Sequence, residues 1–265
     1  MMDTNINISI ITASYNYAEY ISETIESVIN QTYPNWELII VDDGSKDNSV
    51  EIIKSYCNKD DRIKLFQHKN GKNKGLKQTL LLGIKKASAD WIAFLEADDT
   101  LENKYLEEKL KIINDNSKLQ FIFNNFNLIG DSISEKEKYN DFFQKEMANR
   151  SGISDYKEAF YTRNPVPTFS VAMIKKELLE RLDFSSPIKA CLDRYLWSQV
   201  AAQSEFYYIP QKLTNWRQHN NSYYRISKKK ITYLQRLFYY IKISSYLPGI
   251  LQEKIQKMRL LLKIL

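Results

Sequence analysis

The sequence predicts an α/β protein with a mainly parallel central sheet flanked by helices. Four short, β-branched apolar runs have the pattern of buried strands: residues 8–12, 36–41, 63–66 and 91–95. Helical segments separate these runs. In the first of them, Ile21, Ile25, Val28 and Ile29 recur at the spacing of one helix face. Regular alternation of strand and helix predicts parallel strands joined by right-handed crossovers.

Two more helices complete the N-terminal third of this alternation. Asn48 and Glu51 have the spacing of a capping box, which predicts a helix that runs to about Tyr56. Residues 76–88 are helical by pattern and precede the strand over 91–95. The loop before that helix, "HKNGKNKG", is polar and contains glycine.

The second half of the chain is less regular. Strands are expected at 119–123, at 166–174 and at 204–210, where Pro210 ends an edge strand. Residues 192–202 are helical by pattern. Residues 131–160 are polar and charged, so we expect a loop or short helices that cover the site.

The composition is that of a globular protein. A chain of 265 residues, 43% of them hydrophobic, suffices for one sizeable core. Its two cysteines, Cys57 and Cys191, lie far apart, so a reducing compartment is favoured over a disulfide framework. The pattern of a signal peptide is not found, and no run reaches the roughly 18 apolar residues of a membrane span. We therefore expect a soluble or peripheral cytoplasmic protein.

The positive charge is concentrated at the C-terminus. Residues 225–265 contain ten Lys or Arg and one acid, Glu253, whereas the rest of the chain is slightly acidic. Aromatic and aliphatic residues interleave with these charges, as in basic amphipathic helices that lie on anionic membranes. The alternative is a helix that packs on the preceding domain and leaves its basic face in solvent. Nucleic acid is not an expected partner, because no recognition motif accompanies the charge.

Acidic side chains follow two of the predicted strands. "IIVDDGS" ends in Asp42 and Asp43, and "IAFLEADD" ends in Glu96, Asp98 and Asp99. Ligands of open parallel sheets bind outside the carboxyl ends of the strands, so both clusters should face one crevice. A divalent cation such as Mg²⁺ or Mn²⁺ would turn the repulsion between these carboxylates into coordination. The alternative is that the acids after the second strand cap the next helix, since Asp99 and Glu102 have cap spacing.

Three segments together resemble a known family. "ISIITASYN", "QTYPNWELIIVDDGSKDNS" and "WIAFLEADD", in this order, are similar to the family-two inverting glycosyltransferases. The resemblance is dense over residues 6–110. It implies a Rossmann-like GT-A fold, a nucleotide-diphosphate sugar (a UDP-sugar by preference) as donor, a divalent metal, Mn²⁺ or Mg²⁺, and transfer with inversion at the anomeric carbon.

The resemblance also implies roles for residues on the donor side. Ala13 and Tyr15 match positions that contact the nucleobase, and Asp43, or its neighbour Asp42, matches the acid that binds uracil and ribose. Apart from the resemblance, Lys74 or Lys77 would supply a phosphate-facing charge; the alternative is that both are ordinary solvated lysines. The helix positions where the family often has Arg-Asn are here Leu80 and Leu81.

The acid motif after the fourth strand carries the implied metal site. Asp98 and Asp99 match the metal-binding positions. Asp98 also matches a position that binds the nucleotide-sugar donor. Glu96 occupies the donor-binding position where the family usually has Asp. The segment "WRQHNNS" is similar to the family's Arg-x-His-x-x-Ser segment, so His219 is a further candidate to bind metal or diphosphate, flanked by matches at Arg217 and Ser222.

An inverting transfer needs a base for the acceptor hydroxyl. In "KACLDRYLW", Asp193 matches the family's catalytic Asp, with Leu192 where Glu is frequent; Asp183 is a competing candidate. The expected organisation is a catalytic domain over 1–224, with a donor half at 1–115 and an acceptor half at 116–224, and a basic helical tail over 225–265.

These expectations lead to two hypotheses. The first is an active transferase that builds a surface glycan such as a capsule or lipopolysaccharide, acting on a saccharide or lipid-linked saccharide at the inner face of the cell membrane. The second is a non-catalytic relative that binds nucleotide sugar and a partner, which the departures at Glu96 and Leu192 suggest.

Overall fold

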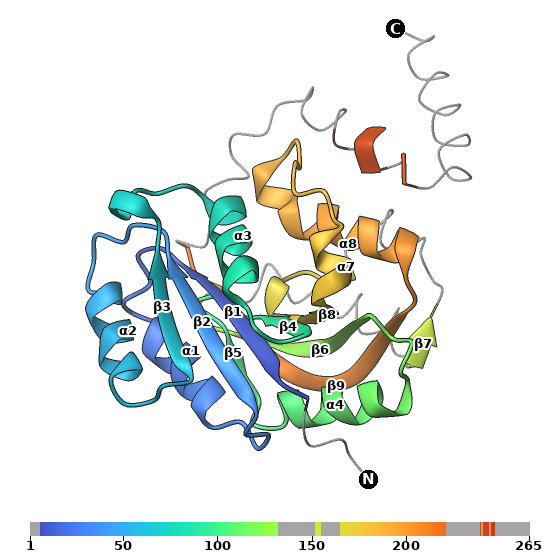
Figure 1. Ribbon diagram of the computed structural model, residues 1–265, viewed down its shortest axis with the longest axis horizontal. Helices are drawn as coiled ribbons and strands as arrows, with labels where there is room; N and C mark the ends of the chain where they lie inside the picture. Colours follow the sequence, from blue (N-terminus) through green and yellow to red (C-terminus); the bar gives the residue numbers. More distant parts are fainter. Residues whose placement is uncertain are drawn as a thin grey trace, which may run out of the picture.

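The computed structural model describes residues 6–131, 152–154, 165–220, 239, 241–243 and 245–246. This part of the chain forms a mixed α/β fold in which helices cover both faces of one curled sheet (Figure 1). The predicted α/β class is therefore confirmed.

The N-terminal strands lie side by side and parallel, as predicted. They are β1 (Ile8–Ser14), β2 (Trp36–Asp42), β3 (Ile63–Gln67) and β4 (Trp91–Phe94), in the order β3-β2-β1-β4. Three helices connect them: α1 (Ile21–Ile29), α2 (Ser49–Cys57) and α3 (Leu76–Lys86). Because Ser14 pairs with Asp42 and Ile11 with Phe94, the carboxyl ends of β1, β2 and β4 meet at one edge.

The remaining strands extend the same sheet in mixed directions. They are β5 (Thr100–Leu101), β6 (Phe121–Ile129), β7 (Gly152–Ser154), β8 (Ala172–Lys175) and β9 (Phe206–Arg217). From β4 the order continues β8-β6-β9-β5, with β7 paired to β9. β8 runs antiparallel to both β4 and β6, whereas β6 and β9 are parallel. The accompanying helices are α4 (Tyr105–Asp115), α7 (Lys176–Glu180) and α8 (Leu192–Gln203).

Apolar residues that alternate along the strands build a core on each face of the sheet. Ile11 and Val41 point to one face, where they join a buried cluster with residues of α3 and α8. Their neighbours Ile10 and Ile40 point to the other face and join residues of α1, α2 and α4. This arrangement follows from the two-residue period of a strand combined with burial on both sides.

The predicted strand over 166–174 is wrong in its first half. A short 3₁₀ turn, η2 (Phe169–Val171), occupies this part, and β8 begins only at Ala172. Thr168 caps the turn by accepting a hydrogen bond from the backbone N–H of Ser170. An apolar run fits a strand and a buried turn equally well, so the pattern alone did not distinguish them.

The prediction that Pro210 ends an edge strand is also wrong. β9 continues through Pro210 to Arg217 and lies between β6 and β5. The register with β6 shifts at this point, since Ile209 pairs with Asn124 but Lys212 pairs with Asn125. Such a bulge accommodates a proline, which cannot donate to the ladder.

The predicted capping box at Asn48 is replaced by another interaction. Asn48 stands at the N-cap of α2 but makes no side-chain cap. Asp47 instead accepts hydrogen bonds from the backbone N–H of Ser49 at 3.1 Å and from its hydroxyl at 2.5 Å. Residues 132–151 and 155–164 lie outside the described residues, and 152–154 form β7 rather than the expected loop or helix.

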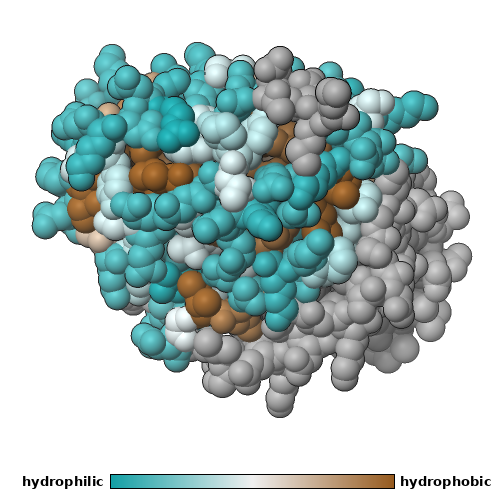
Figure 2. All heavy atoms as spheres, turned by 90° about the horizontal axis from the view of Figure 1, so that it is seen from below, coloured by the Kyte–Doolittle hydropathy of each residue, from teal (hydrophilic) through white to brown (hydrophobic). Residues whose placement is uncertain are grey.

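Hydrophilic side chains cover most of the described surface seen in Figure 2, and the hydrophobic residues there form small separate groups. Among the described residues, no helix combines the length and apolarity required to cross a bilayer.

Candidate active site

The loops after β1 and β2 are joined to each other at the carboxyl edge of the sheet. The backbone N–H of Asn16 donates to the Ser45 hydroxyl at 2.9 Å, and the Asn16 side chain accepts from the Lys46 N–H at 2.7 Å. Asn16 has a φ of 58°, a left-handed conformation that asparagine tolerates better than most residues. Asp47 accepts from the N–H of Ala18 at 3.0 Å. These contacts hold both loops in one arrangement.

The two acids that end β2 have separate tasks. Asp42 is fully buried and closes the turn that follows it, because its carboxylate accepts from the N–H groups of Gly44 and Ser45 and from the Ser45 hydroxyl. Asp43 reaches across to the loop before α3, where it accepts from the N–H groups of Lys74 at 2.6 Å and Gly75 at 2.9 Å. The loop that the sequence associates with phosphate is therefore held by Asp43.

Gly44 allows this loop to lie close to β2. Its φ of +84° is left-handed, and a Cβ at this position would lie 2.5 Å from the carbonyl oxygen of Gly71. A side chain here would therefore displace the loop. The Lys74 side chain is exposed and that of Lys77 half-buried, whereas Leu80 is buried in the core. Where the resemblance implies a polar residue, Leu80 instead packs in the apolar core.

Ala13 and Tyr15 lie at the end of β1 and just beyond it. Ala13 is half-buried beside the core of the α3 face, and Tyr15 is 42% exposed. An exposed aromatic ring at this edge is free to stack on a flat ligand. The structure therefore leaves Tyr15 accessible at the position expected to contact the nucleobase.

The three acids after β4 occupy three different environments. Glu96 accepts a hydrogen bond from the Thr168 hydroxyl at 2.5 Å. Asp99 is fully buried and accepts from the Ser170 hydroxyl at 2.6 Å and from the backbone N–H of Arg217 at 2.8 Å. Burial first, and then the negative charges of Asp98 and Glu96, raise the pKa of Asp99 well above its ordinary value.

The alternative in which Asp98 and Asp99 cap the next helix is wrong. That helix, α4, begins at Tyr105 with Lys104 at its N-cap, and β5 separates it from the acids. Asp98 and Asp99 therefore lie at the carboxyl end of β4 and do not cap a helix.

Asp98 forms a pair with His219. Nε2 of His219 lies 2.8 Å from Oδ2 of Asp98, although the residues are 121 positions apart. Both side chains are almost buried, with 9% and 10% of their surfaces exposed. The imidazole packs beside Tyr20, with ring centroids 5.0 Å apart, and meets Tyr17 edge-on. The sequence-predicted Asp98 and His219 are thus brought together.

Arg217 fastens this pair to α1. Its Nε donates to the backbone carbonyl of Asp98 at 2.8 Å, and its terminal nitrogen pairs with Glu23 of α1. The guanidinium lies over the ring of Tyr20, 5.0 Å from its centroid. Ser222, the last position of the motif, lies outside the described residues.

Sequence reasoning missed Thr168, Ser170 and Glu23. The two hydroxyls bind Glu96 and Asp99, and Glu23 binds Arg217. No motif spacing connects them to the acids, because they come from η2 and α1. The only sequence feature of Thr168 and Ser170 is that they are polar residues within the apolar run "VPTFSVAMI".

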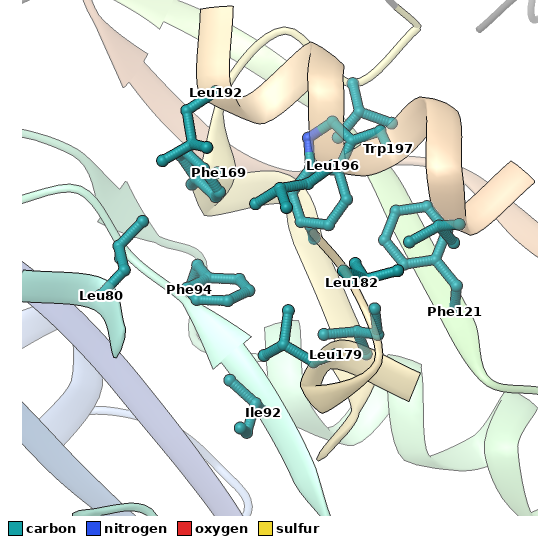
Figure 3. Close-up of a cluster of buried hydrophobic side chains, with 14 of the residues drawn as sticks. Leu80, Ile92, Phe94, Phe121, Phe169, Leu179, Leu182, Leu192, Leu196 and Trp197 are labelled. Carbon is teal, nitrogen blue, oxygen red and sulfur yellow. The ribbon is translucent and has the colours of Figure 1, made fainter. Parts of the chain in front are cut away.

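Asp193 lies in the first turn of α8 and is half-buried. Its neighbour Leu192 is buried, and Figure 3 shows it beside Phe169. Phe169 also contacts Phe94 and Trp197, with ring centroids 5.3 and 5.4 Å apart. Leu192 therefore serves packing, and the apolar cluster places the start of α8 next to η2, whose Ser170 binds Asp99.

Asp183, the competing base candidate, is occupied by other groups. It accepts from Lys242 at 2.8 Å, from the Tyr195 hydroxyl at 2.7 Å and from the Ser185 hydroxyl at 2.7 Å. Burial opposes ionisation of this carboxyl, but these hydrogen bonds prevail and lower its pKa. A carboxylate stabilised in this way is a weak base, so Asp183 is poorly suited to accept a proton.

The residues present fit a divalent cation that is shared with a ligand. In the described part of the chain, no three His, Cys, Asp or Glu side chains gather closely enough to hold a metal by themselves. Asp98 and His219 offer two donor atoms at one point. Mg²⁺ is commonly bound by one or two side chains, with water and phosphate oxygens completing its shell. The adjacent Asp99 is buried, and its carboxylate accepts hydrogen bonds from the Ser170 hydroxyl and the Arg217 backbone N–H.

The fold and the acidic edge define an α/β protein built to bind a ligand at the carboxyl ends of its strands. Residues 9–183 match the family model described as glycosyl transferase family 2, and the chain belongs to that family. An uncharacterized glycosyltransferase of Rickettsia bellii (strain RML369-C) is 31% identical over 210 residues. The alignment covers 79% of this chain but only 28% of the relative's length.

Two solved structures show the same fold. S. aureus TarS 1-349 in complex with UDP-GlcNAc has a TM-score of 0.68 at 17% identity, covering 90% of this chain and 67% of the TarS 1-349 chain. The mannosyltransferase PcManGT from Pyrobaculum calidifontis, in complex with GDP-Man and Mn²⁺, has a TM-score of 0.62 at 16% identity, covering 92% and 65%. The predicted Rossmann-like GT-A architecture is thereby confirmed.

The different burial of the acids predicts different effects on stability. Asp99→Ala leaves the Arg217 N–H and the Ser170 hydroxyl without their acceptor, so it should lower the free energy of unfolding by about 1–3 kcal/mol. Asp98→Asn removes one of three like charges and should change it little. Urea unfolding measures both. Equal stability of Asp99→Ala and the wild type would show that the hydrogen bonds of Asp99 to Ser170 and Arg217 do not stabilise the fold.

Proposed function

We propose that this chain is an inverting glycosyltransferase that uses a nucleotide-diphosphate sugar. The observation that carries the proposal is the pairing of Asp98 with His219 at the carboxyl edge of the sheet, where ligands of such sheets bind. Membership of glycosyl transferase family 2 supports this reaction class.

Asp98 and His219 are the residues that would hold a divalent metal. The ion, Mn²⁺ or Mg²⁺, would supply positive charge to the leaving diphosphate. The neighbouring Arg217 holds Asp98 through its backbone and stacks on Tyr20, so both ligands are fixed in position. Asp99, which the sequence also assigns to the metal, is proposed to support this pair from the buried side.

The donor is proposed to be a uridine diphosphate sugar. TarS, which shares the fold, was solved with UDP-GlcNAc. In this chain, Tyr15 and Ala13 would contact the base, Asp43 or its neighbour Asp42 would bind uracil and ribose, and Glu96 and Asp98 would contact the donor. Asp42 and Asp43 shape the adjoining loops, and Lys74 stands exposed on the loop that Asp43 holds.

The metal pair predicts metal-dependent nucleotide binding. UDP should raise the melting temperature only in the presence of Mn²⁺ or Mg²⁺, since a ligand at 100 times its Kd adds about 2.7 kcal/mol. Asp98→Asn and His219→Ala should each abolish the shift, while Glu51→Gln on the surface of α2 should retain it. Isothermal calorimetry with UDP and GDP identifies the nucleotide. Undiminished UDP binding in excess EDTA would contradict the metal role.

Asp193 is proposed as the catalytic base. The acceptor hydroxyl oxygen forms a bond to the anomeric carbon as the bond to the diphosphate oxygen breaks, and the hydroxyl proton passes to the Asp193 carboxylate. A carboxylate with ordinary acidity suffices, because the hydroxyl becomes acidic as the new bond forms. Asp193 lies in the first turn of α8, a helix that packs on η2 through the contact of Trp197 with Phe169.

Asp193→Asn tests the base directly. It can still accept a hydrogen bond but cannot take the proton, so kcat should fall by at least about 10²-fold while UDP affinity stays unchanged. Steady-state kinetics and calorimetry measure the two quantities. Loss of UDP binding with near-normal turnover would place Asp193 in the donor site. Absence of turnover in the wild type, together with intact UDP binding, would favour the alternative, a non-catalytic nucleotide-sugar-binding relative.

The acceptor is proposed to be a saccharide or lipid-linked saccharide of a surface glycan, reached at the inner face of the membrane. The basic composition of residues 225–265 supports this location, since basic residues near an anionic surface each contribute about 1 kcal/mol of attraction. Most of this tail lies outside the described residues.

Neutralising part of the tail tests membrane attachment. Replacing Lys228, Lys229 and Lys230 by Gln should reduce flotation with phosphatidylserine vesicles at low salt, because each charge is attracted to the surface. High salt should have the same effect on the wild type. Lys85→Gln, on the exposed surface of α3, is the matched control. Failure of the wild type to float at low salt would exclude this attachment.

A further inference from the structure

Residues of the C-terminal tail contact α8 on both sides of Asp193. The Tyr239 hydroxyl lies 3.5 Å from the carbonyl oxygen of Cys191, which is the N-cap residue of α8. The Tyr246 hydroxyl lies 3.0 Å from that of Tyr195. Cys191 precedes Asp193 by two positions and Tyr195 follows it by two. The tail therefore contacts the turn that carries the candidate base.

An ion pair fastens the same tail segment to the chain before α8. Nζ of Lys242 donates to Asp183 at 2.8 Å and to the hydroxyl and carbonyl of Ser185 at 2.6 and 3.1 Å. Asp183 in turn accepts from the Tyr195 hydroxyl, so one carboxylate links tail and helix. Lys242 also lies over the Tyr195 ring, 5.1 Å from its centroid.

The contact is buried as well as polar. Tyr239 and Ile243 are each 2% exposed and belong to the same apolar cluster as Leu192 and Leu196 of α8. Ile241, on the opposite side of the segment, is 49% exposed. Burial of one side of the segment is expected of a docked segment, and the buried apolar area contributes to the position of α8.

We propose that Tyr239, Lys242, Ile243 and Tyr246 form an intramolecular clasp that positions the first turn of α8, and with it Asp193. This inference rests on the proposed function, because it assigns Asp193 the role of base. The four clasp residues are positioning residues: Tyr239, Lys242 and Tyr246 reach Cys191, Asp183 and Tyr195, and Ile243 packs in the apolar cluster of α8. Opening the clasp therefore changes the acceptor side and leaves the donor side unchanged.

Cys191 reports on the clasp without any assay of activity. In a Cys57→Ser background it is the sole thiol of the chain. It is partly buried, and Tyr239 lies over its carbonyl. Tyr239→Phe and Lys242→Met should each raise the rate at which N-ethylmaleimide alkylates Cys191 severalfold. Lys242→Arg, which retains the charge, should restore the slow rate, and Lys85→Met should not change it.

Kinetics then test whether the clasp acts through Asp193. With UDP-N-acetylglucosamine as donor and water as acceptor, Lys242→Met should lower kcat severalfold, leave the affinity for UDP unchanged and be rescued by Lys242→Arg. A general loss of stability would instead lower kcat and UDP affinity together. That joint loss, or wild-type kcat in a variant whose Cys191 has become reactive, overturns the positioning role.

The two levels of the proposal fail in different ways. A wild-type protein that neither binds UDP nor hydrolyses the donor overturns the proposed function, while the alkylation rates still decide whether the clasp exists. Unchanged alkylation in both Tyr239→Phe and Lys242→Met overturns the clasp, whatever the activity.

Discussion

Three carboxylates within four positions after β4 impose the constraint on which the rest of the site depends. Glu96, Asp98 and Asp99 repel one another, and a buried carboxylate without hydrogen bonds is costly. Each acid has polar partners: Thr168 for Glu96, His219 for Asp98, and Ser170, Thr168 and the Arg217 backbone for Asp99. These partners come from η2 and β9, so compensating the charges also assembles the edge of the sheet.

This requirement explains the two irregular segments of the second half. The 3₁₀ turn η2 and its N-cap residue bring two hydroxyls to one carboxylate: those of Thr168 and Ser170 reach Asp99 at 3.1 and 2.6 Å. β9 must extend beyond Pro210 for Arg217 and His219 to arrive at the same point. The bulge at Pro210 is the local adjustment that permits this extension.

The side of the candidate site that carries Asp193 is organised by apolar packing instead of charge. Phe94 of β4, Phe169 of η2 and Trp197 of α8 contact one another, so the strand that carries the acids and the helix that carries Asp193 share one core. Close-packed aromatic groups resist displacement, which couples the two sides of the candidate site through a rigid element. The described tail residues enlarge this cluster from its outer side.

The sequence by itself determined the N-terminal half of the sheet and the edge that carries the site. Strand and helix periodicity are local properties, and parallel alternation brings Asp42, Asp43 and the acids after β4 to one edge by topology alone. The resemblance pointed to Asp98 in these segments, and to Asp193 and His219 in two shorter segments further along the chain.

Only the tertiary structure decided what each acid contacts. Thr168 and His219 lie 72 and 121 positions from their partners Glu96 and Asp98, and no local pattern encodes such separations. The same reason applies to Asp99, whose burial depends on strands brought together from the second half, and to Asp183, whose carboxylate is taken by Lys242 from the tail. Local periodicity therefore specified the scaffold, whereas the charge environment of each carboxylate arose only when distant segments packed against one another.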